Sequence, residues 1–306
     1  MNVRRVVCES IVWLALVLSL GGAPHFPASA QRDRRAAAQP FRVMTYNIRY
    51  DDPRAGQLAW ANRREMVASM IRFHQADIVG LQEALANQLA DLERMLPGFV
   101  AFGAGRDDGG RKGEFSAILY NKARFRFLSG KTFWLSETPA VAGSRGWDAA
   151  YPRVVTWAKF EERATGKTFF HFNTHFDHRG ERARVESARL LLRSVWRIAG
   201  RSAPVIVTGD FNFNEAAEGY RILTGKADAQ SPGARVLHDA RYLSLHGHHG
   251  PTATFNDFKA LVPDSKIDHV FAGKGVKVRQ HGVLSDIWDG RFPSDHFPVL
   301  AELVLD

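Results

Sequence analysis

Short apolar runs recur along the chain between residues 41 and 304, and most of them are bounded by glycine, proline or charged residues. Runs of this length that are rich in β-branched and aromatic side chains predict β-strands. We therefore expect strands at residues 41–46, 76–83, 99–102, 115–120, 125–128, 153–160, 168–175, 205–208, 267–272, 277–284 and 297–304.

A second pattern, with apolar residues three and four positions apart, lies between these runs. It predicts amphipathic helices at residues 63–74, 86–96, 181–198 and 216–223. The length of 306 residues would allow one large domain or two smaller ones. Because strands and helices are interleaved without an intervening linker, we expect residues 41–306 to form one domain.

The N-terminal pattern differs from the rest of the chain. Two arginines precede an apolar run at residues 11–20, and the segment Ala-Ser-Ala follows it at residues 28–30. This order is typical of a secretory signal peptide at residues 1–30, and the run is too short to span a bilayer comfortably. We expect a secreted or periplasmic protein with no stable membrane span after cleavage; the alternative is an uncleaved anchor. Residues 31–40 are polar and alanine-rich, which predicts a flexible leader.

The composition is that of a soluble globular protein, with 45% hydrophobic and 24% charged residues. The single cysteine, Cys8, lies within the expected signal peptide, so disulfides and thiolate zinc sites are excluded from a chain that begins at Gln31. The formal net charge is +9, to which residues 1–30 contribute only two arginines and one glutamate. A basic surface favours phosphate or other anionic partners but says little about the fold.

The strand at residues 205–208 ends directly before a carboxylate and an amide, in the sequence Gly-Asp-Phe-Asn at residues 209–212. Side chains alternate along an extended chain, so Asp210 and Asn212 are expected to point the same way. Glycine, aspartate and asparagine also favour turns, which leaves an ordinary turn as the alternative.

Other predicted strands also end in residues that bind divalent cations or phosphates. These residues are Asn47, Glu83, His175, Asp268, Asp295 and His296. Taken singly, each has a structural explanation: Glu83 lies near the start of a helix, and His175 could be a core histidine with satisfied hydrogen bonds. The repetition of the pattern at several strand ends favours one shared site.

The motifs that carry these residues occur in the order TYNIR, GLQE, NTHFDH, GDFN, IDH and SDHFPV. In combination they resemble the endonuclease/exonuclease/phosphatase superfamily, with its DNase I-like or exonuclease III-like fold, over residues 41–304. The segments TYNIRYD, GRDDG, TFWLSETP and GWDAA are similar to a secreted bacterial branch of it. The resemblance implies an α+β (α/β) four-layer sandwich, in which two packed mixed β-sheets are flanked by helices, with one site at an edge where loops meet.

The residue types fit the hydrolysis of a phosphate ester with the help of a metal. Glu83 offers hard oxygen ligands, which suit Mg²⁺, or alternatively Mn²⁺, better than zinc. By resemblance, Asn47 would support the metal or the phosphate, and Asp295 would contact a second metal or its waters.

The resemblance also implies roles for five residues that would act on the phosphate. Asp210 would orient or deprotonate the attacking water, and Asn212 would hold the phosphate. His296 would contact the scissile phosphate, while Asp268 accepts its other N–H and fixes the tautomer. His175 would polarise the phosphate or protonate the leaving group.

Three further residues are candidates for binding the substrate: Arg153, Arg106 and His178. Arg153 resembles an arginine that supports the site, with a plain surface arginine as the alternative. Arg106 lies in a segment that is either a substrate-facing loop or a solvated turn. Trp134 and Trp147 would form an aromatic wall for a base or sugar or, as we expect, belong to the core.

These observations predict an exported, Mg²⁺-dependent hydrolase of phosphoric esters. The basic charge favours a nuclease that cuts phosphodiester bonds of extracellular DNA or RNA. The first alternative is a lipid or small-molecule phosphodiesterase or phosphatase, similar to a sphingomyelinase or an inositol phosphatase. The second is a non-catalytic binding module, against which the intact set of site residues speaks. We expect a monomer whose partner is the phosphate-ester substrate.

Overall fold

Two β-sheets pack face to face in the computed structural model, which describes residues 39–227 and 236–306. The first sheet has the strand order β10 (His248–His249), β12 (Val276–Val283), β13 (Val299–Leu305), β1 (Phe41–Asn47), β2 (Ile78–Gln82), β4 (Ile118–Asn121) and β3 (Phe99–Phe102). The second has the order β5 (Phe125–Trp134), β6 (Val154–Glu162), β7 (Thr168–His175), β8 (Val205–Asp210), β11 (Asp268–Ala272) and β9 (His238–Asp239). Both sheets are mixed, because β1 runs parallel to β2 and β7 parallel to β8, whereas most other pairs are antiparallel.

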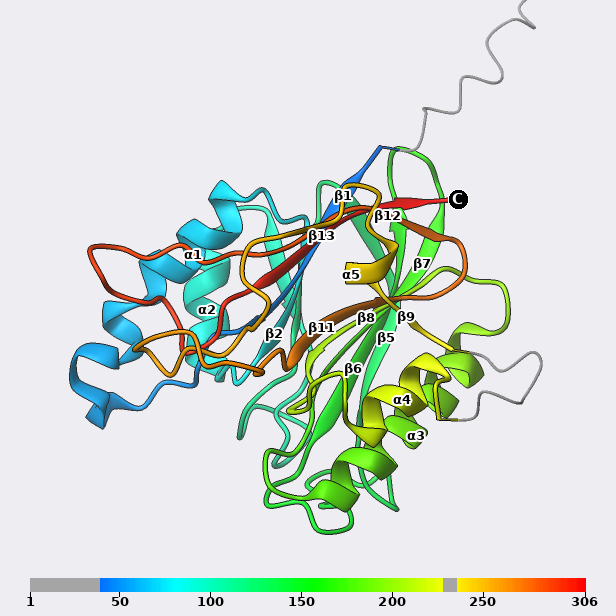
Figure 1. The fold of residues 1–306 in the computed structure, drawn as a ribbon, viewed down its shortest axis with the longest axis horizontal. Coiled ribbons are helices and arrows are strands. Elements are labelled where there is room, and N and C mark those ends of the chain that lie inside the picture. The colour runs from blue at the N-terminus through cyan, green and yellow to red at the C-terminus, as the bar shows by residue number, and fades with distance from the viewer. Residues whose placement is uncertain (1–38, 228–235) are drawn as a thin grey trace, which may run out of the picture. The chain divides into compact units, whose positions relative to one another are not determined.

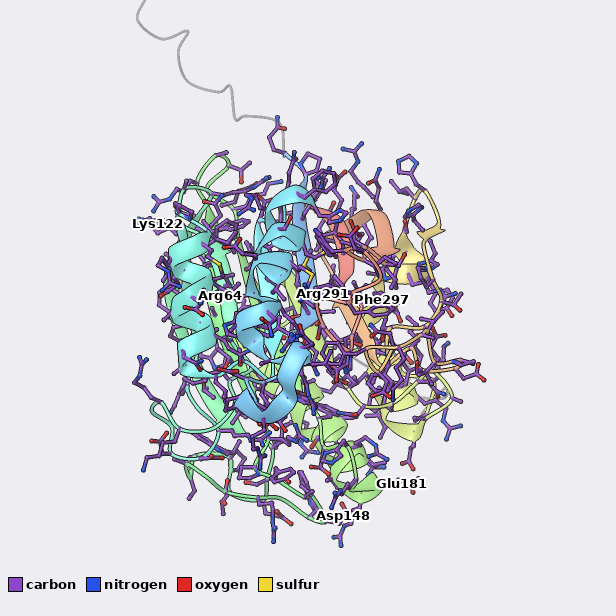
Figure 2. The ribbon with its side chains drawn as sticks, turned by 90° about the vertical axis from the view of Figure 1, so that its left-hand side faces the viewer. Arg64, Lys122, Asp148, Glu181, Arg291 and Phe297 are labelled. Carbon is purple, nitrogen blue, oxygen red and sulfur yellow. The ribbon has the colours of Figure 1, made fainter. Side chains whose placement is uncertain are left out.

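Helices cover the outer face of each sheet (Figure 1). The helices α1 (Arg64–Phe73) and α2 (Ala86–Met95) pack on the first sheet, and Figure 2 looks onto this layer. The helices α3 (Glu181–Ala199) and α4 (Glu218–Thr224) pack on the second sheet. The layers are therefore helix, sheet, sheet and helix, which confirms the predicted four-layer sandwich. Three short helices complete the described elements: η1 (Pro53–Leu58), η2 (Trp60–Asn62) and α5 (Ala240–Leu243).

The central strands are apolar on both faces because both faces are buried. In β1, Val43 belongs to the core between the sheets, while its neighbour Met44 packs with α1 and α2. In β8, Ile206 faces the first sheet, and Val207 packs with α3 and α4. This double burial explains why the sequence shows continuous apolar runs here rather than alternation with polar residues.

A buried polar cluster connects the two sheets within this apolar interior. Asn173 of β7 donates from Nδ2 to the backbone carbonyls of Leu81 (2.8 Å) and Ala117 (2.9 Å) on the first sheet. Its Oδ1 accepts from Gln82 Nε2 (2.7 Å) and from Thr208 Oγ1 (3.0 Å). Since an unpaired buried polar group is costly, these bonds fix how the sheets lie against each other.

Most predicted strands and helices agree with the structure to within a few residues at each end. The strand predicted at residues 115–120 begins later, at Ile118, because Phe115 forms isolated bridges to two other segments instead. The strand predicted to end at residue 128 continues to Trp134, past a bulge that interrupts the hydrophobic pattern but not the pairing with β6.

The described residues all fall within one unit, Ala36–Asp306. The predicted signal peptide at residues 1–30 and nearly all of the predicted leader at residues 31–40 lie outside the described part of the chain. Among the described helices, none combines the length and the apolar character that crossing a bilayer would require.

Replacement of Gly80 tests the close packing around the polar cluster. A Cβ atom at this position would lie 2.2 Å from Thr208 Oγ1 and 2.4 Å from Asn173 Oδ1. We expect Gly80→Ala to lower the free energy of unfolding by about 1–3 kcal/mol, because the sheets must separate or the cluster must break. Denaturant unfolding measures the change.

The matched control is Gly110→Ala. Its added Cβ would meet only the exposed Asp108 side chain, at 3.3 Å, so that the change can disturb no more than the surface bonds from the backbone N–H groups of Gly110 and Lys112 to Asp108 Oδ1. A Gly80→Ala protein as stable as this control would show that the sheets are not held by the cluster.

Candidate active site

Strand ends from both sheets meet at one edge of the sandwich. In the second sheet, His175 of β7 lies opposite Asp210 of β8, which in turn lies opposite Asp268 of β11. In the first sheet, Asn47 ends β1 and Glu83 directly follows β2. Strand pairing places the residues of each sheet side by side, and the packing of the two sheets brings Asn47 within 3.0 Å of Asp210.

A cleft of about 560 Å³ opens at this edge. Nine of the residues predicted for the site line it: Glu83, Arg106, Arg153, His175, His178, Asp210, Asn212, Asp295 and His296. The two others, Asn47 and Asp268, lie behind the lining and hydrogen bond to it. The structure thus brings all of the predicted site residues to one place.

Asn47 joins the two sheets at the base of the cleft. Its side chain is buried, and Nδ2 donates to Glu83 Oε1 at 3.1 Å and to Asp210 Oδ2 at 3.0 Å. Its Oδ1 accepts the backbone N–H of Arg49 at 3.0 Å. Because the amide is engaged at both ends, this geometry fits a residue that spaces the two carboxylates better than one that binds a metal directly.

Glu83 and Asp295 form a group of oxygen donors that suits a hard cation. Glu83 Oε2 and Asp295 Oδ2 lie 3.4 and 3.8 Å from the same guanidinium nitrogen, Nη1 of Arg49. Burial, with a smaller contribution from the charge of Glu83, raises the pKa of Asp295. A divalent cation would relieve this unfavourable concentration of negative charge, and carboxylate oxygens are ligands that Mg²⁺ prefers. The residues present therefore fit a divalent cation.

His296 is held between carboxylates. Its Nδ1 lies 2.8 Å from Asp268 Oδ2, and its Nε2 lies 3.8 Å from Asp210 Oδ2. Burial opposes the charged imidazolium, but the negative charges of Asp268, Asp210 and Asp295 outweigh it and raise the pKa of His296 to about 10. The ring that lines the cleft is therefore a cation at neutral pH.

Asp210, Asp268 and His296 form a second group that could hold a cation, since one donor atom of each lies within 4.8 Å of the others. Burial and the negative charge of Asp268 raise the pKa of Asp210 to about 7. The group already contains a positive charge on His296, which Asp268 contacts through Oδ2, while Asp268 Oδ1 has no hydrogen-bond partner among the described residues. It is therefore better explained as a hydrogen-bonded array around an imidazolium, which leaves Glu83 and Asp295 as the better cation ligands.

Asn212 and His175 form a neutral pair on the second sheet. Asn212 has a left-handed backbone, with φ 51°, and its Nδ2 donates to the carbonyl of Phe176 (3.0 Å) and lies 3.1 Å from His175 Nε2. Burial and the positive charge of Arg153 hold the pKa of His175 well below its usual value. His175 Nε2 also lies 3.4 Å from Asp210 Oδ2, and His175 Nδ1 lies 4.0 Å from Glu114 Oε2, so each ring nitrogen has a carboxylate nearby.

This arrangement bears on two of the expected roles. Asn212 lies between the carbonyl of Phe176 and the ring of His175, so its side chain orients His175. Because its pKa is held low, His175 fits a neutral hydrogen-bonding group better than an acid that protonates the leaving group.

The sequence that forms this cleft is similar to the sequences of a known protein family. A family model described as the Endonuclease/Exonuclease/phosphatase family matches residues 44–296, a range that includes every residue of the site. The chain belongs to the endonuclease/exonuclease/phosphatase family. Members of this family are phosphoester hydrolases, and the two-sheet fold agrees with theirs.

Two solved structures and one curated relative illustrate the similarity. The endonuclease/exonuclease/phosphatase of Bacteroides vulgatus is 40% identical, with a TM-score of 0.81 over 88% of this chain and 100% of that chain. The mannosyl-6-phosphatase of Bacteroides thetaiotaomicron is 38% identical, with a TM-score of 0.78 over 87% of this chain and 100% of that chain. An uncharacterized protein of Acanthamoeba polyphaga mimivirus is 27% identical over 256 residues, 79% of this chain and 91% of that protein.

One wall of the cleft in this family member combines arginines with an aromatic stack. Arg106 Nη1 donates to Glu114 Oε2 at 2.6 Å, and its guanidinium lies 5.0 Å from the centre of the Tyr151 ring. Tyr151 stacks on His178 with ring centres 6.0 Å apart, and His178 Nδ1 lies 3.0 Å from Arg153 Nη2. We call these five residues the arginine–tyrosine wall.

Asp177 anchors this wall to the second sheet and to α3. Its carboxylate accepts the backbone N–H groups of Gly180 (2.8 Å) and Ala150 (3.1 Å) and lies 3.3 Å from Arg153 Nε. Asp148, in the same segment as the wall, accepts backbone N–H groups in the first turn of α3, near Glu181 in Figure 2. The segment before β6 is thereby tied down at two points.

Sequence reasoning did not single out four residues that the geometry makes important: Arg49, Glu114, Tyr151 and Asp177. Two of them lie within the sequence motifs that point to the site: Arg49 is in TYNIR and Asp177 is in NTHFDH. For the tryptophans, Trp134 is buried and donates its indole N–H to the carbonyl of Arg106, while Trp147 does not line the cleft. The aromatic rings that line the cleft are instead those of Tyr50, Tyr151 and Phe255.

We expect Asp177→Asn to lower the free energy of unfolding by about 1–2 kcal/mol at pH 7. Burial opposes the charge of Asp177, but the backbone N–H bonds and Arg153 outweigh it and lower its pKa to about 2. A folded-state pKa below the ordinary value of an aspartate stabilises the protein above that value. The stabilisation is lost as falling pH protonates the carboxylate, so the difference between the two proteins should shrink between about pH 4 and pH 2.

Denaturant unfolding of both proteins across this pH range checks the expectation. Asp289→Asn is the matched control, since its exposed side chain bonds to no other described residue. A stability difference for Asp177→Asn that is independent of pH would contradict the electrostatic explanation.

Proposed function

We propose that this protein is an exported, divalent-metal-dependent phosphoesterase whose substrate is a small phosphate ester. Membership of the family supports the class of reaction. The observation that carries the proposal is the position of His296, whose ring lies 2.8 Å from Asp268 Oδ2 and 3.8 Å from the buried carboxylate of Asp210, in a cleft that Glu83 and Asp295 also line. A cationic donor, a carboxylate and an oxygen-rich metal site are the groups that attack of water on a phosphate requires.

Each of these side chains has a distinct task in the proposed reaction. Asp210, with its raised pKa, accepts the proton of the attacking water as the new P–O bond forms. The imidazolium of His296 donates a hydrogen bond to a phosphoryl oxygen, whose negative charge grows while the bond to the leaving oxygen breaks. The leaving alkoxide takes a proton from water in the open cleft, and Asp210 returns its proton to solvent. Asp268 keeps His296 protonated and oriented, and Asn47 keeps Asp210 at a fixed distance from Glu83.

Glu83 and Asp295 would hold the cation, Mg²⁺ or alternatively Mn²⁺. When bound, such an ion supplies positive charge for the phosphate and lowers the pKa of coordinated water. Arg49, which contacts both carboxylates, keeps part of their charge balanced.

Two observations favour a small ester over a nucleic acid. A mannosyl-6-phosphatase is 38% identical to this chain, and the match covers 87% of this chain and 100% of the phosphatase. Five carboxylates and three arginines line the cleft, whereas a groove that follows a nucleic-acid backbone is expected to be predominantly positive. Glu114 and the half-exposed ring of Tyr151 suit the hydroxyl groups and the ring face of a sugar.

A nuclease is the second candidate, and the formal net charge of +9 favours it. This charge describes the whole surface, whereas the substrate meets the local charge of the cleft. For that reason we rank the small phosphate ester first.

Hydrolysis assays of the purified protein with Mg²⁺ and with EDTA test the proposal. We expect release of phosphate from hexose 6-phosphates, loss of this activity in EDTA, and recovery with excess Mg²⁺, while plasmid DNA and RNA stay intact. Cutting of plasmid or RNA without release of phosphate from sugars would favour the nuclease. Inactivity on all of these, and on a generic diester, would favour a non-catalytic binding module.

Two substitutions test the assigned residues on whichever substrate is hydrolysed. We expect Asp210→Asn and His296→Ala each to lower kcat/KM by at least about 10²-fold, because each removes a group that acts on the reacting atoms. Thermal unfolding separates this loss from misfolding. The matched controls are Asp289→Asn and His246→Ala, which change exposed residues outside the cleft. Near-normal activity of either active-site variant would overturn the assignment.

The proposal of export rests on the sequence of residues 1–30. We expect the protein recovered from expressing cells outside the cytoplasm to begin at Gln31, as N-terminal sequencing would show. Recovery of the full-length chain only, in the cytoplasm, would contradict export.

A further inference from the structure

A groove of about 610 Å³ lies between the second sheet and α3, and it shares no lining residue with the cleft of the active site. Phe133 and Trp157 line it from the sheet, and Leu190 and Ile198 line it from α3. Except for Phe133, these apolar side chains are only half-buried, so α3 covers the sheet incompletely here. We call this region the α3 groove, and its volume is in the range of small-molecule sites.

Three cations border the α3 groove: Lys131 of β5, and Arg193 and Arg197 of α3. All three side chains are exposed, and none forms an ion pair or hydrogen bond with another described residue. The described lining contains no carboxylate. Apolar surface and uncompensated positive charge therefore coincide in one place.

The neighbouring turn of α3 gives an internal comparison. Arg189 is bound by two glutamates, each at 2.7 Å, and it does not line the groove. Arg193 and Arg197 follow at intervals of four residues, a spacing at which like charges repel on a helix surface. The arginines of α3 are therefore no longer paired with carboxylates where the α3 groove begins. A bound anion would compensate their positive charge.

We propose that the α3 groove binds an amphipathic anion, a soluble molecule with an alkyl or acyl chain of moderate length and a carboxylate headgroup. The chain lies against Trp157 and Leu190, where it removes apolar surface from water. The headgroup pairs with Lys131, Arg193 and Arg197 at the border of the groove. This site is independent of the proposed phosphoesterase activity.

Titration calorimetry of the full chain with three probes of equal chain length tests the proposal: decanoate, decanol and decyltrimethylammonium, each below its micelle concentration. EDTA is present, so that no divalent cation in the active-site cleft attracts the carboxylate. We expect decanoate to bind at one site at least about ten-fold more tightly than decanol, and the ammonium to bind most weakly. The affinity for decanoate should fall as salt is added.

Two variants locate the binding. Arg193→Glu should weaken decanoate binding by up to about ten-fold, whereas Arg182→Glu, the same change on an exposed residue of α3 outside the groove, should leave it nearly unchanged. Ala140→Trp, which fills the groove from its exposed border and keeps all three cations, should abolish binding without lowering the melting temperature.

Three results would overturn the proposal. The first is absence of decanoate binding, and the second is equal affinity for decanoate and decanol. The third is an equal effect of Arg193→Glu and Arg182→Glu, which would indicate attraction to the whole basic surface. A concentration-dependent dimer in sedimentation that Ala140→Trp disrupts would instead show that a second copy of the chain occupies the groove, and it would also overturn the proposal.

Discussion

The active-site cleft depends on the buried polar cluster that fixes one sheet against the other. Asn173 donates to the carbonyls of Leu81 and Ala117 across the sandwich, and these bonds cannot be exchanged for water in the dry interior. Two residues farther along the same strands lie His175 and Glu83. The bonds of Asn173 therefore set the distance between the halves of the site, one from each sheet, before any substrate arrives.

The same constraint determines the electrostatics of the cleft. Carboxylates from both sheets are brought together in a buried place, which raises the pKa of Asp210 and Asp295 and makes His296 a stable imidazolium. Asn47 holds Glu83 and Asp210 apart with a single amide group. A site of this kind concentrates negative charge that a divalent cation would balance, while its imidazolium faces the space where a phosphate would bind.

The residues proposed for chemistry and those proposed for selectivity lie in different parts of the fold. The residues proposed to act on the phosphate are at or next to strand ends, which the sheets hold rigidly, whereas the arginine–tyrosine wall comes largely from connecting segments. Asp177 ties these segments to the sheet through backbone N–H groups. This division separates the residues proposed for phosphoester hydrolysis from those proposed to contact the rest of the substrate.

The sequence by itself determined most strands, the four longer helices and the family, and it named candidate site residues that the fold brings together, because each of these depends on local patterns or on short motifs. It did not reveal the short helices η1, η2 and α5 or the contacts of Arg49 and Tyr151, because these depend on packing between segments far apart in the chain. Net charge also says little about the cleft: the chain is basic as a whole, whereas the cleft has more carboxylates than arginines. Only the tertiary structure decides which charges meet, because side-chain pairing is fixed by packing rather than by composition.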